Sequence, residues 1–572
     1  MLDILLAIAS LPGIDPKSSF CFVDSGLSIG RLTDGTDDEI KHHVFKFELP
    51  FYSDSSVDHV LDLSTDELLS NGHKTSKFAT DNIIDYFSVK IVSSNAKQLS
   101  RMFQLLFGFE EIAYKGLETG STLIGSHVVS SGNIVIEFIN TLESILKEVE
   151  LNLEHPDLET TIESLFGKKL VNQLVNDYAN YKLSNTLMNC RNPSNQLMQT
   201  ILKSREIKVL SQKFQELAIK TVDIAEPIYN DFVEAKLIQD FLEKHTDGVM
   251  DISFVTNDLE KSFTRAINGG AKAIRQPSII SDDFGSVKIA TIGVPNTDLH
   301  HTMVENINYI GSYLPGFHAD DFDTEDNLFR KVAHNNVLPE VPLTCIDHCV
   351  ENYIWNQSLP QVKFYAEAFG FHKFWSVSDN DISTENSSLI SIVMASSNGK
   401  IKIPINEPAK GKMRGQIEEF YDFHHGPGIQ HIAFKTNNII SAVRGLKERG
   451  MEFNLAPVKY YSNLIKRMRN DDVAIRESME EIIELGILVD YDASSRNKLT
   501  RKCNYILQIF TKPLHDRPTL FIEIIQRHHH NGFGKGTFKG LFETIEEQQK
   551  LRGTLIPYED DEVNVEGTLY LM

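Results

Sequence analysis

Three ionisable residues each lie in the middle of a short apolar run. They are His348 in "TCIDHCV", His431 in "GIQHIAF" and Glu523 in "TLFIEII". A buried imidazole or carboxylate is costly unless it is paired or bound to a metal. If the three runs are neighbouring strands, two imidazoles and one carboxylate can hold a divalent metal on one side and leave other coordination positions open. That ligand set is the pattern of non-haem Fe(II) oxygenases.

Strand alternation assigns the neighbours of these residues to faces. Each of the three ionisable residues then shares a strand face with mostly apolar residues. The three faces are Thr344, Ile346, His348 and Val350; Ile429, His431 and Ala433; and Thr519, Phe521, Glu523 and Ile525. Alternation also points Cys345 and Cys349 away from His348, which disfavours a Cys/His zinc site. Taken alone, a strand histidine is more often a hydrogen-bonded core residue, and a strand glutamate more often an edge or salt-bridge residue.

A repeat within the chain helps to decide between a structural and a metal-binding role. The stretch "GVMDISFVTNDLEKSFTRAINGGAKAIRQP" from Gly248 resembles "GIQHIAFKTNNIISAVRGLKERGMEFNLAP" from Gly428. Each reads as a strand, a turn, an amphipathic helix and a second strand. Two further pairs begin at Asn82 and Thr344, and at His301 and Thr519. The chain is therefore a divergent duplication with the order strand, helix, strands.

At the places that match the three ionisable residues, the first half has Phe87, Asp251 and Glu305. The first half lacks both histidines, so we expect one half to hold a metal and the other not to. A purely structural role would give less reason for this asymmetry.

Composition limits the class of protein. The chain has 572 residues, 41% of them hydrophobic, which is enough for two or more domains. The net charge of −23 disfavours a nucleic acid or an anionic membrane as partner. Five scattered cysteines do not form a disulfide framework. The N-terminus lacks a basic signal-peptide region, so we expect a soluble cytoplasmic protein.

The pattern along the chain predicts five segments. Residues 1–76 form an N-terminal extension, and 77–312 form a first half without metal, interrupted by a helical insertion at about 142–231. Residues 313–342 form a linker, and 343–572 form the catalytic half. We interpret the insertion as a surface helical hairpin rather than as a separate activity.

Three other motifs have simpler interpretations. The histidines in "HHH" at 528–530 and "HH" at 424–425 are expected in solvated loops. "GFGKG" at 532–536 lacks the Walker spacing and reads as a flexible hinge. The helix after it presents apolar residues on one side and is expected to close over the pocket as a lid: Phe538, Leu541, Phe542 and Ile545.

Longer motifs of the second half, taken together, are similar to the 4-hydroxyphenylpyruvate dioxygenase family. They are "GFHKFWSV", "IPINEPAKGK", "GPGIQHIAF", "LQIFTKPLHDRPTLFIEIIQRH" and "GFGKGTFKGLFETIEEQQKLRG". The first half contributes "YKGLETGS" and "HTMVENINYIGSYLPGF", so the resemblance covers about residues 82–141 and 232–555. The implied fold is α+β, with tandem βαβββ modules of the vicinal-oxygen-chelate type forming open barrels. The implied reaction converts 4-hydroxyphenylpyruvate and O2 to homogentisate and CO2 in tyrosine catabolism.

The resemblance also implies roles for individual residues. One Fe(II) per chain would be held by His348, His431 and Glu523. The polar positions of the pocket, which the family uses in catalysis, fall on Ser391, Asn406 and Gln416. Substrate-binding positions fall on Phe510, Phe521, Phe533, Phe538 and Gln430. Alternation points Gln430 away from His431, so only a local twist or bulge would bring it into the pocket.

Alternatives to the dioxygenase remain at this point. 4-Hydroxymandelate synthase shares the substrate, metal and fold, and differs in the position that is hydroxylated. A binding or regulatory paralogue without turnover would be expected to have lost a ligand, whereas all three are present. We expect a small-molecule substrate and O2, no nucleic acid or membrane partner, and a homodimer.

Overall fold

The structure is a computed structural model, and it describes residues 82–121, 123–142, 222–319, 338–377, 384 and 386–558. Within these residues, two mixed β-sheets lie in one compact unit of the chain. Each sheet belongs to one half of the duplication.

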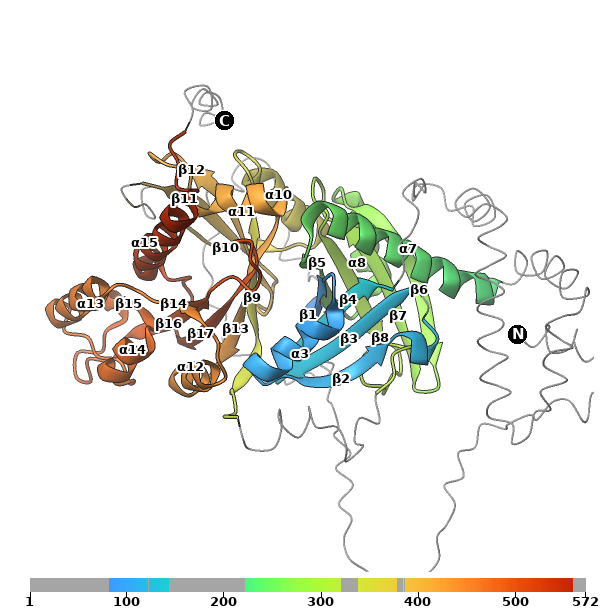
Figure 1. Ribbon diagram of the computed structural model, residues 1–572, viewed down its shortest axis with the longest axis horizontal. Coiled ribbons are helices and arrows are strands. Elements are labelled where there is room, and N and C mark those ends of the chain that lie inside the picture. Colours follow the sequence, from blue (N-terminus) through green and yellow to red (C-terminus); the bar gives the residue numbers. More distant parts are fainter. Residues whose placement is uncertain are drawn as a thin grey trace, which may run out of the picture. The chain divides into compact units, whose positions relative to one another are not determined.

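The first-half sheet has the strand order β2-β3-β4-β1-β5-β8-β7-β6 (Figure 1). Its strands are β1 (Ile83–Val92), β2 (Glu110–Lys115), β3 (Ile124–Ser131), β4 (Ile134–Thr141), β5 (Gly248–Thr256), β6 (Lys272–Asp282), β7 (Gly285–Gly293) and β8 (His300–Asn306). Helix α3 (Ala96–Phe107) follows β1, and α8 (Leu259–Asn268) follows β5. A longer helix, α7 (Val222–His245), leads into β5.

The second-half sheet repeats this order as β10-β11-β12-β9-β13-β17-β16-β14. Its strands are β9 (Leu343–Asn352), β10 (His372–Val377), β11 (Ser388–Ala395), β12 (Lys402–Ala409), β13 (Gly428–Thr436), β14 (Phe453–Asn454), β15 (Leu488–Asp492), β16 (Asn504–Thr511) and β17 (Phe521–His528). Its helices are α10 (Ser358–Ala368), α11 (Gln416–His424), α12 (Ile439–Glu448), α13 (Val458–Asn470), α14 (Met479–Leu485) and α15 (Lys535–Arg552). The extra strand β15 pairs with β16.

Each sheet therefore consists of two βαβββ modules, which confirms the predicted fold class. The modules meet at an antiparallel pair, β1 with β5 in one half and β9 with β13 in the other. In both halves the strand after this junction leads into a helix through a side-chain cap. Asp258 caps α8 by accepting from the Lys261 N–H, and Asn438 caps α12 by accepting from the Ser441 N–H, both at 3.1 Å.

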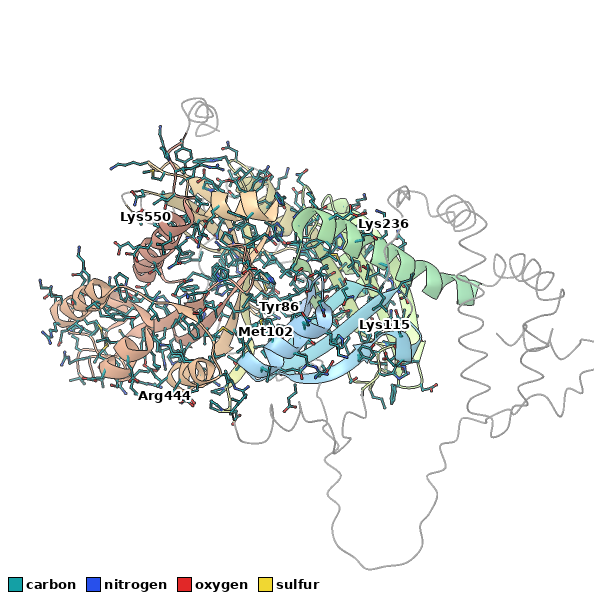
Figure 2. The ribbon with its side chains drawn as sticks, viewed as in Figure 1. Tyr86, Met102, Lys115, Lys236, Arg444 and Lys550 are labelled. Atoms are coloured by element: carbon teal, nitrogen blue, oxygen red, sulfur yellow. The ribbon has the colours of Figure 1, made fainter. Side chains whose placement is uncertain are left out.

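The two sheets share one hydrophobic core. Apolar residues of α3, α8, α10 and α12 belong to a single buried cluster with residues of both sheets. The rings of Phe107 and Phe434, one from each half, meet edge to face at 6.0 Å. Tyr86 of β1, labelled in Figure 2, also donates a hydrogen bond of 2.8 Å to the Lys402 carbonyl of β12. The outer faces of the sheets are thus filled by packing, which leaves the inner face of each curled sheet for chemistry.

The pairing register corrects the match of Phe87 in β1 with His348 in β9. Ser88 pairs with Ser253 in the first half, whereas His348 pairs with Ala433 in the second. Since β5 and β13 align from Gly248 and Gly428, Ser88 takes the place of His348, and the prediction that Phe87 does so is wrong.

The prediction that Glu305 matches Glu523 is also wrong. β8 pairs His300 with Asp251, whereas β17 pairs Phe521 with His431. Thr302 therefore takes the place of Glu523, and Glu305 takes the place of Gln526. A helix cap supports this register independently. Glu305 accepts from the first N–H of α8 at 2.8 Å, and Gln526 accepts from the first N–H of α12 at 2.7 Å.

Both halves contain β-bulges at matching places, so the bulges do not shift one half against the other, but they change which side chains share a face. A bulge adds one residue to a strand, so counting by twos loses step there. The extra residues include Asp347 and Gln430 in the second half and Phe87 and Met250 in the first. Ile346 and Ile429, which lie before the bulges, pack in the shared core with Cys349. Their expected place on the faces of His348 and His431 is therefore wrong.

Several predicted segments lie outside the described residues. These are the extension at 1–76, most of the insertion at 142–231 and most of the linker at 313–342. At the start of the predicted linker, Tyr313 stacks on Phe87 at 5.3 Å, so the chain is still part of the first half there. In the described part of the chain, no helix combines the length and apolar composition needed to cross a membrane.

Candidate metal centre

The predicted ligand residues meet on the inner face of the second sheet. β9, β13 and β17 are neighbours in it (Figure 1). They carry His348, His431 and Glu523. One potential ligand atom from each residue lies within 4.8 Å of the others. The Nε2 atoms of His348 and His431 lie 3.1 and 3.4 Å from the same Glu523 oxygen, Oε2. All three side chains are buried.

The bulged residues orient the two imidazoles. Asp347 Oδ1 lies 2.8 Å from His348 Nδ1, and Gln430 Oε1 lies 3.1 Å from His431 Nδ1. Because each bulge turns an extra side chain toward the following histidine, both rings are held at Nδ1 by the residue that precedes them. The expectation that Gln430 points away from His431 is wrong for this reason. The bulge was the one geometry that could bring it in.

The hydrogen-bond pattern fits a cation. A carboxylate or amide oxygen can only accept, so each Nδ1 carries the hydrogen and donates. In a neutral imidazole the Nε2 lone pair then points at Glu523 Oε2. Two lone pairs facing a carboxylate oxygen repel unless a positive charge lies between them. Two imidazoles and a carboxylate are also the donor set that a divalent transition metal takes in open, one-sided sites.

The ionisation of the site is consistent with that arrangement. Burial alone would raise the pKa of Glu523, but His348 and His431 lower it to about 2, so the carboxylate is charged. Burial lowers the pKa of His431, which favours its neutral, ligating form. Burial would also lower the pKa of His348, but the carboxylates of Glu523 and Asp347 raise it.

Aromatic rings surround the ligands. Phe521 stacks on His431 at 4.8 Å between ring centroids, and Phe510 meets the same ring edge to face at 5.9 Å. Phe533 meets His348 edge to face at 5.0 Å. Three of the four predicted phenylalanines are thus at the site. The side chain of Phe538 lies outside the described residues.

The predicted polar positions form a row across neighbouring strands. Ser391 pairs with Asn406 between β11 and β12, and Asn406 Nδ2 donates to Asn352 Oδ1 at 3.2 Å. On the other side, Gln430 Nε2 donates to Gln416 Oε1 at 3.2 Å. The contact between Gln430 and Gln416 connects the start of α11 to the side chain that holds His431.

Four residues of the site were not predicted from the sequence. Gln508 donates to Glu523 Oε1 at 2.7 Å and so fixes the oxygen that the histidines do not face. Asp347 and Arg527 form a buried ion pair beside His348. Asn352 is fully buried, and its Nδ2 has no hydrogen-bond partner. Each is a polar residue inside an apolar strand, the same signal that singled out the ligands.

The other histidines do not behave as the motifs predicted. His424 is buried at the end of α11 and stacks on His245 at 4.3 Å. His528 ends β17, stacks on Tyr505 at 4.2 Å and lies 2.9 Å from Glu477. Both were expected in solvated loops, which is wrong because each is the last residue of a regular element and turns its ring inward. His425 and His529 are exposed, as expected.

Helix α15 lies against the site through its described side chains. Phe542 packs with Leu389 and Ile417, and Ile545 packs against the cluster of Phe510 and Phe521. The helix begins after Gly534, whose φ of 87° is unfavourable for other residues. Two residues of the predicted apolar side, Phe542 and Ile545, therefore pack beside the site in this structure.

Comparison with known proteins gives consistent results. Residues 346–476 match the family described as the Glyoxalase/Bleomycin resistance protein/Dioxygenase superfamily. A 4-hydroxyphenylpyruvate dioxygenase of Coccidioides posadasii is 37% identical over 81% of this chain and 92% of that protein. The one of Yarrowia lipolytica is 37% identical over 84% and 98%. The one of Dictyostelium discoideum is 34% identical over 81% and 97%.

Two solved structures share the fold. A mutant 4-hydroxymandelate synthase from Streptomyces coelicolor has a TM-score of 0.54 at 21% identity, covering 82% of this chain and 99% of that one. A xylose isomerase-like TIM barrel/4-hydroxyphenylpyruvate dioxygenase fusion protein has a TM-score of 0.50 at 14% identity, covering 82% and 54%. At these identities the likeness concerns the fold alone.

Proposed function

The chain belongs to the 4-hydroxyphenylpyruvate dioxygenase family, and from this premise we propose that it converts 4-hydroxyphenylpyruvate and O2 to homogentisate and CO2 in tyrosine catabolism. The proposal includes one Fe(II) per chain, with His348, His431 and Glu523 as its ligands. The observation that carries it is the convergence of two imidazole Nε2 atoms on one carboxylate oxygen in a buried site.

The protein's own contribution is to hold the ligands and the substrate. A bound Fe(II) would supply coordination sites for a 2-oxo acid and for O2. Asp347, Gln430 and Gln508 fix the ligand side chains through the contacts described above. Because these groups are already oriented, little reorganisation is needed when substrate binds.

The aromatic and the polar side chains contact different parts of the substrate. Phe510, Phe521 and Phe533 provide an apolar wall beside the ligands that suits a phenol ring. Ser391, Asn406 and Gln416 provide hydrogen bonds for polar groups of the substrate or of an intermediate. The side chains of these three residues are less than a tenth exposed, so the site excludes most water.

An anaerobic titration with Fe(II), followed by addition of 4-hydroxyphenylpyruvate and O2 and by chromatography of the products, tests the proposal. We expect saturation near one Fe(II) per chain and stoichiometric homogentisate. 4-Hydroxymandelate as the product would assign the alternative reaction. Iron binding without O2 uptake would assign a silent paralogue. The homodimer and the cytoplasmic location stay predictions, and light scattering tests the first.

A further inference from the structure

A buried ion pair connects the strand of the first ligand to the strand of the third. Arg527 of β17 donates from Nε to Asp347 Oδ2 at 2.8 Å and from NH2 to Asp347 Oδ1 at 2.7 Å. The side chains of Arg527 and Asp347 are 11% and 2% exposed. Two parallel hydrogen bonds between a guanidinium and a carboxylate fix the relative orientation of both groups.

The carboxylate in this pair also holds a ligand. Asp347 Oδ1 accepts from Arg527 and lies 2.8 Å from His348 Nδ1. The position of Arg527 therefore determines the position of the carboxylate, and the carboxylate determines the rotation of the His348 ring. Arg527 touches neither the expected metal nor the expected substrate, so its effect must pass through Asp347.

The remaining donor of the same guanidinium holds the chain before α15. Arg527 NH1 donates to the Gly532 carbonyl at 2.5 Å and to the His530 carbonyl at 3.1 Å. The guanidinium also lies over the Phe533 ring, 5.0 Å from its centroid. The Phe533 ring in turn meets the His348 ring edge to face, with 5.0 Å between the ring centroids. One side chain thus contacts both the support of a ligand and the segment that begins the helix.

We propose that Arg527 is a positioning residue that couples metal binding at His348 to the placement of residues 530–533 at the start of α15. The inference rests on the proposed metal site, but it needs no statement about the substrate. Coupling of this kind is reciprocal, so an ordered segment should strengthen metal binding as much as the metal orders the segment. Lysine cannot replace arginine here, because a single ammonium cannot make two parallel bonds to Asp347 and also reach two carbonyls.

The first test compares Arg527→Lys with a matched control. Arg552 of α15 makes the same forked pair, with Glu419, through Nε at 2.9 Å and NH2 at 2.7 Å, far along the chain from the ligands. Co(II) is titrated into each apo-protein, and its visible absorption bands report coordination geometry and affinity. We expect R527K to bind Co(II) about 10- to 100-fold more weakly with altered bands. R552K should stay close to wild type. Equal losses in both variants would mean general destabilisation and would overturn the proposal.

The second test measures the coupling itself by hydrogen exchange. Addition of Co(II) should slow exchange of the backbone amides in residues 530–541 in the wild type and in R552K. The same addition should produce no change in that peptide in R527K, even at saturating Co(II). Protection that persists undiminished in R527K would overturn the coupling.

A double variant guards against misfolding of the single one. Arg527→Met with Asp347→Asn removes both buried charges, so neither is left unpaired. We expect it to fold, with a cooperative thermal transition, and to bind Co(II) more weakly than wild type. Wild-type affinity in this variant would show that the pair acts only by charge balance and would overturn the proposal. If Co(II) binds to the wild type as expected but the Fe(II)-loaded wild type forms no homogentisate, the proposed function fails while this inference stands.

Discussion

At the residue scale, each ligand histidine is positioned by the residue directly before it in the chain. Asp347 and Gln430 can do this only because a bulge breaks the alternation of their strands. The two supports differ in charge. Asp347 gives His348 a carboxylate partner, whereas Gln430 gives His431 a neutral amide, so the two imidazoles differ in basicity as well as in position.

The amide chain from Gln416 through Gln430 to His431 gives a first prediction. Gln416→Ala and Gln430→Ala should each lower kcat about 10- to 100-fold, because the orientation of His431 depends on both. Since the residues act in series, the double variant should be little worse than the poorer single one. The coupling energy in this double-mutant cycle should be about 1–3 kcal/mol. Additive losses would show that the two amides act separately.

The ligand assignment gives a second prediction. His431→Ala should reduce bound iron from about one per chain to near zero and abolish turnover, since only two ligand side chains remain. His425→Asn is the control, because His425 is exposed and its φ of 59° is tolerated by asparagine. Metal analysis and product formation are measured on both. A wild-type stoichiometry near two, or full turnover in H431A, would contradict the assignment.

At the element scale, buried polar contacts fasten the second half of α15. Glu546 is buried and accepts hydrogen bonds from the side chains of Ser387 at 2.6 Å and Asn386 at 2.7 Å, and also from Thr384. Arg552 pairs with Glu419 at the start of α11. Release of the whole helix from the pocket would therefore have to break these contacts.

The Glu546 anchor gives a third prediction. Glu546→Ala should leave metal affinity nearly unchanged but loosen the helix, since several hydrogen bonds to a charged acceptor are lost, each worth roughly 1.5–3 kcal/mol. Oxygen uptake should then exceed homogentisate formation. Glu547→Ala, at the exposed neighbouring position, is the control. If E546A keeps a one-to-one ratio of O2 to product, the helix is not needed to protect the reaction.

A buried hydrogen-bond network connects elements of both halves. The Tyr365 hydroxyl of α10 lies 2.7 Å from His301 Nε2 of β8 and also contacts Glu351 of β9. His301 Nδ1 lies 2.9 Å from the Ile252 carbonyl, so the hydrogen of a neutral His301 is on Nδ1 and Nε2 accepts from Tyr365. The contact between Tyr365 and Glu351 is then a hydrogen bond only if Glu351 is protonated. Burial raises the pKa of Glu351 to about 7, which agrees with a protonated Glu351.

The Glu351 pKa gives a fourth prediction. A raised pKa in the folded state means that folding favours the protonated form. This contribution to stability is full below the ordinary pKa of 4.5 and is lost as pH rises toward 7. The loss should be roughly 3 kcal/mol across that window. Glu351→Gln mimics the neutral acid and should lack this dependence. Urea unfolding of both proteins between about pH 5 and 8 measures it. A constant difference in the free energy of unfolding across this range would contradict the prediction.

The sequence predicted the modules and the ligands but not the bulges. Strand, helix and turn patterns recur in both halves, and each ligand is an ionisable residue in an apolar strand, so these features follow from local composition. A bulge depends on which strands pair and in what register, and alternation within one strand contains no information about it. The errors at Ile346 and Gln430 have this cause. The errors at Phe87 and Glu305 are instead misalignments of the repeat, which only the strand pairing corrects. Gln508 and Arg527 were missed because their partners lie on other strands.

At the scale of the whole molecule, the described strands of both sheets pair with one another without residues of the insertion. β4 ends at Thr141 and α7 begins at Val222, and the described strands of the first half pair with one another across this gap in the chain. The insertion also interrupts the half whose equivalent positions hold Ser88, Asp251 and Thr302. Its presence is therefore not required to assemble the ligand set.

That separation gives a fifth prediction. Replacing residues 143–221 with a short Gly/Ser linker should leave kcat within about tenfold, since a flexible connection of different length changes stability only modestly. Iron content and turnover of the folded deletion variant are the measurements. A variant that binds iron normally but has lost all activity would show that the insertion takes part in catalysis.

The bulges shared by the two halves have one more consequence. Phe87 and Met250 stand where Asp347 and Gln430 stand, so the first sheet has the backbone shape of the site with none of its ligands. At its centre, Asp251 accepts from the Thr302 hydroxyl at 2.6 Å and from the Ser253 hydroxyl at 2.7 Å. The first sheet is thus an internal control that lacks the metal ligands. Any spectroscopic or structural change on metal addition can be compared, within one chain, between a site with ligands and a site of the same shape without them.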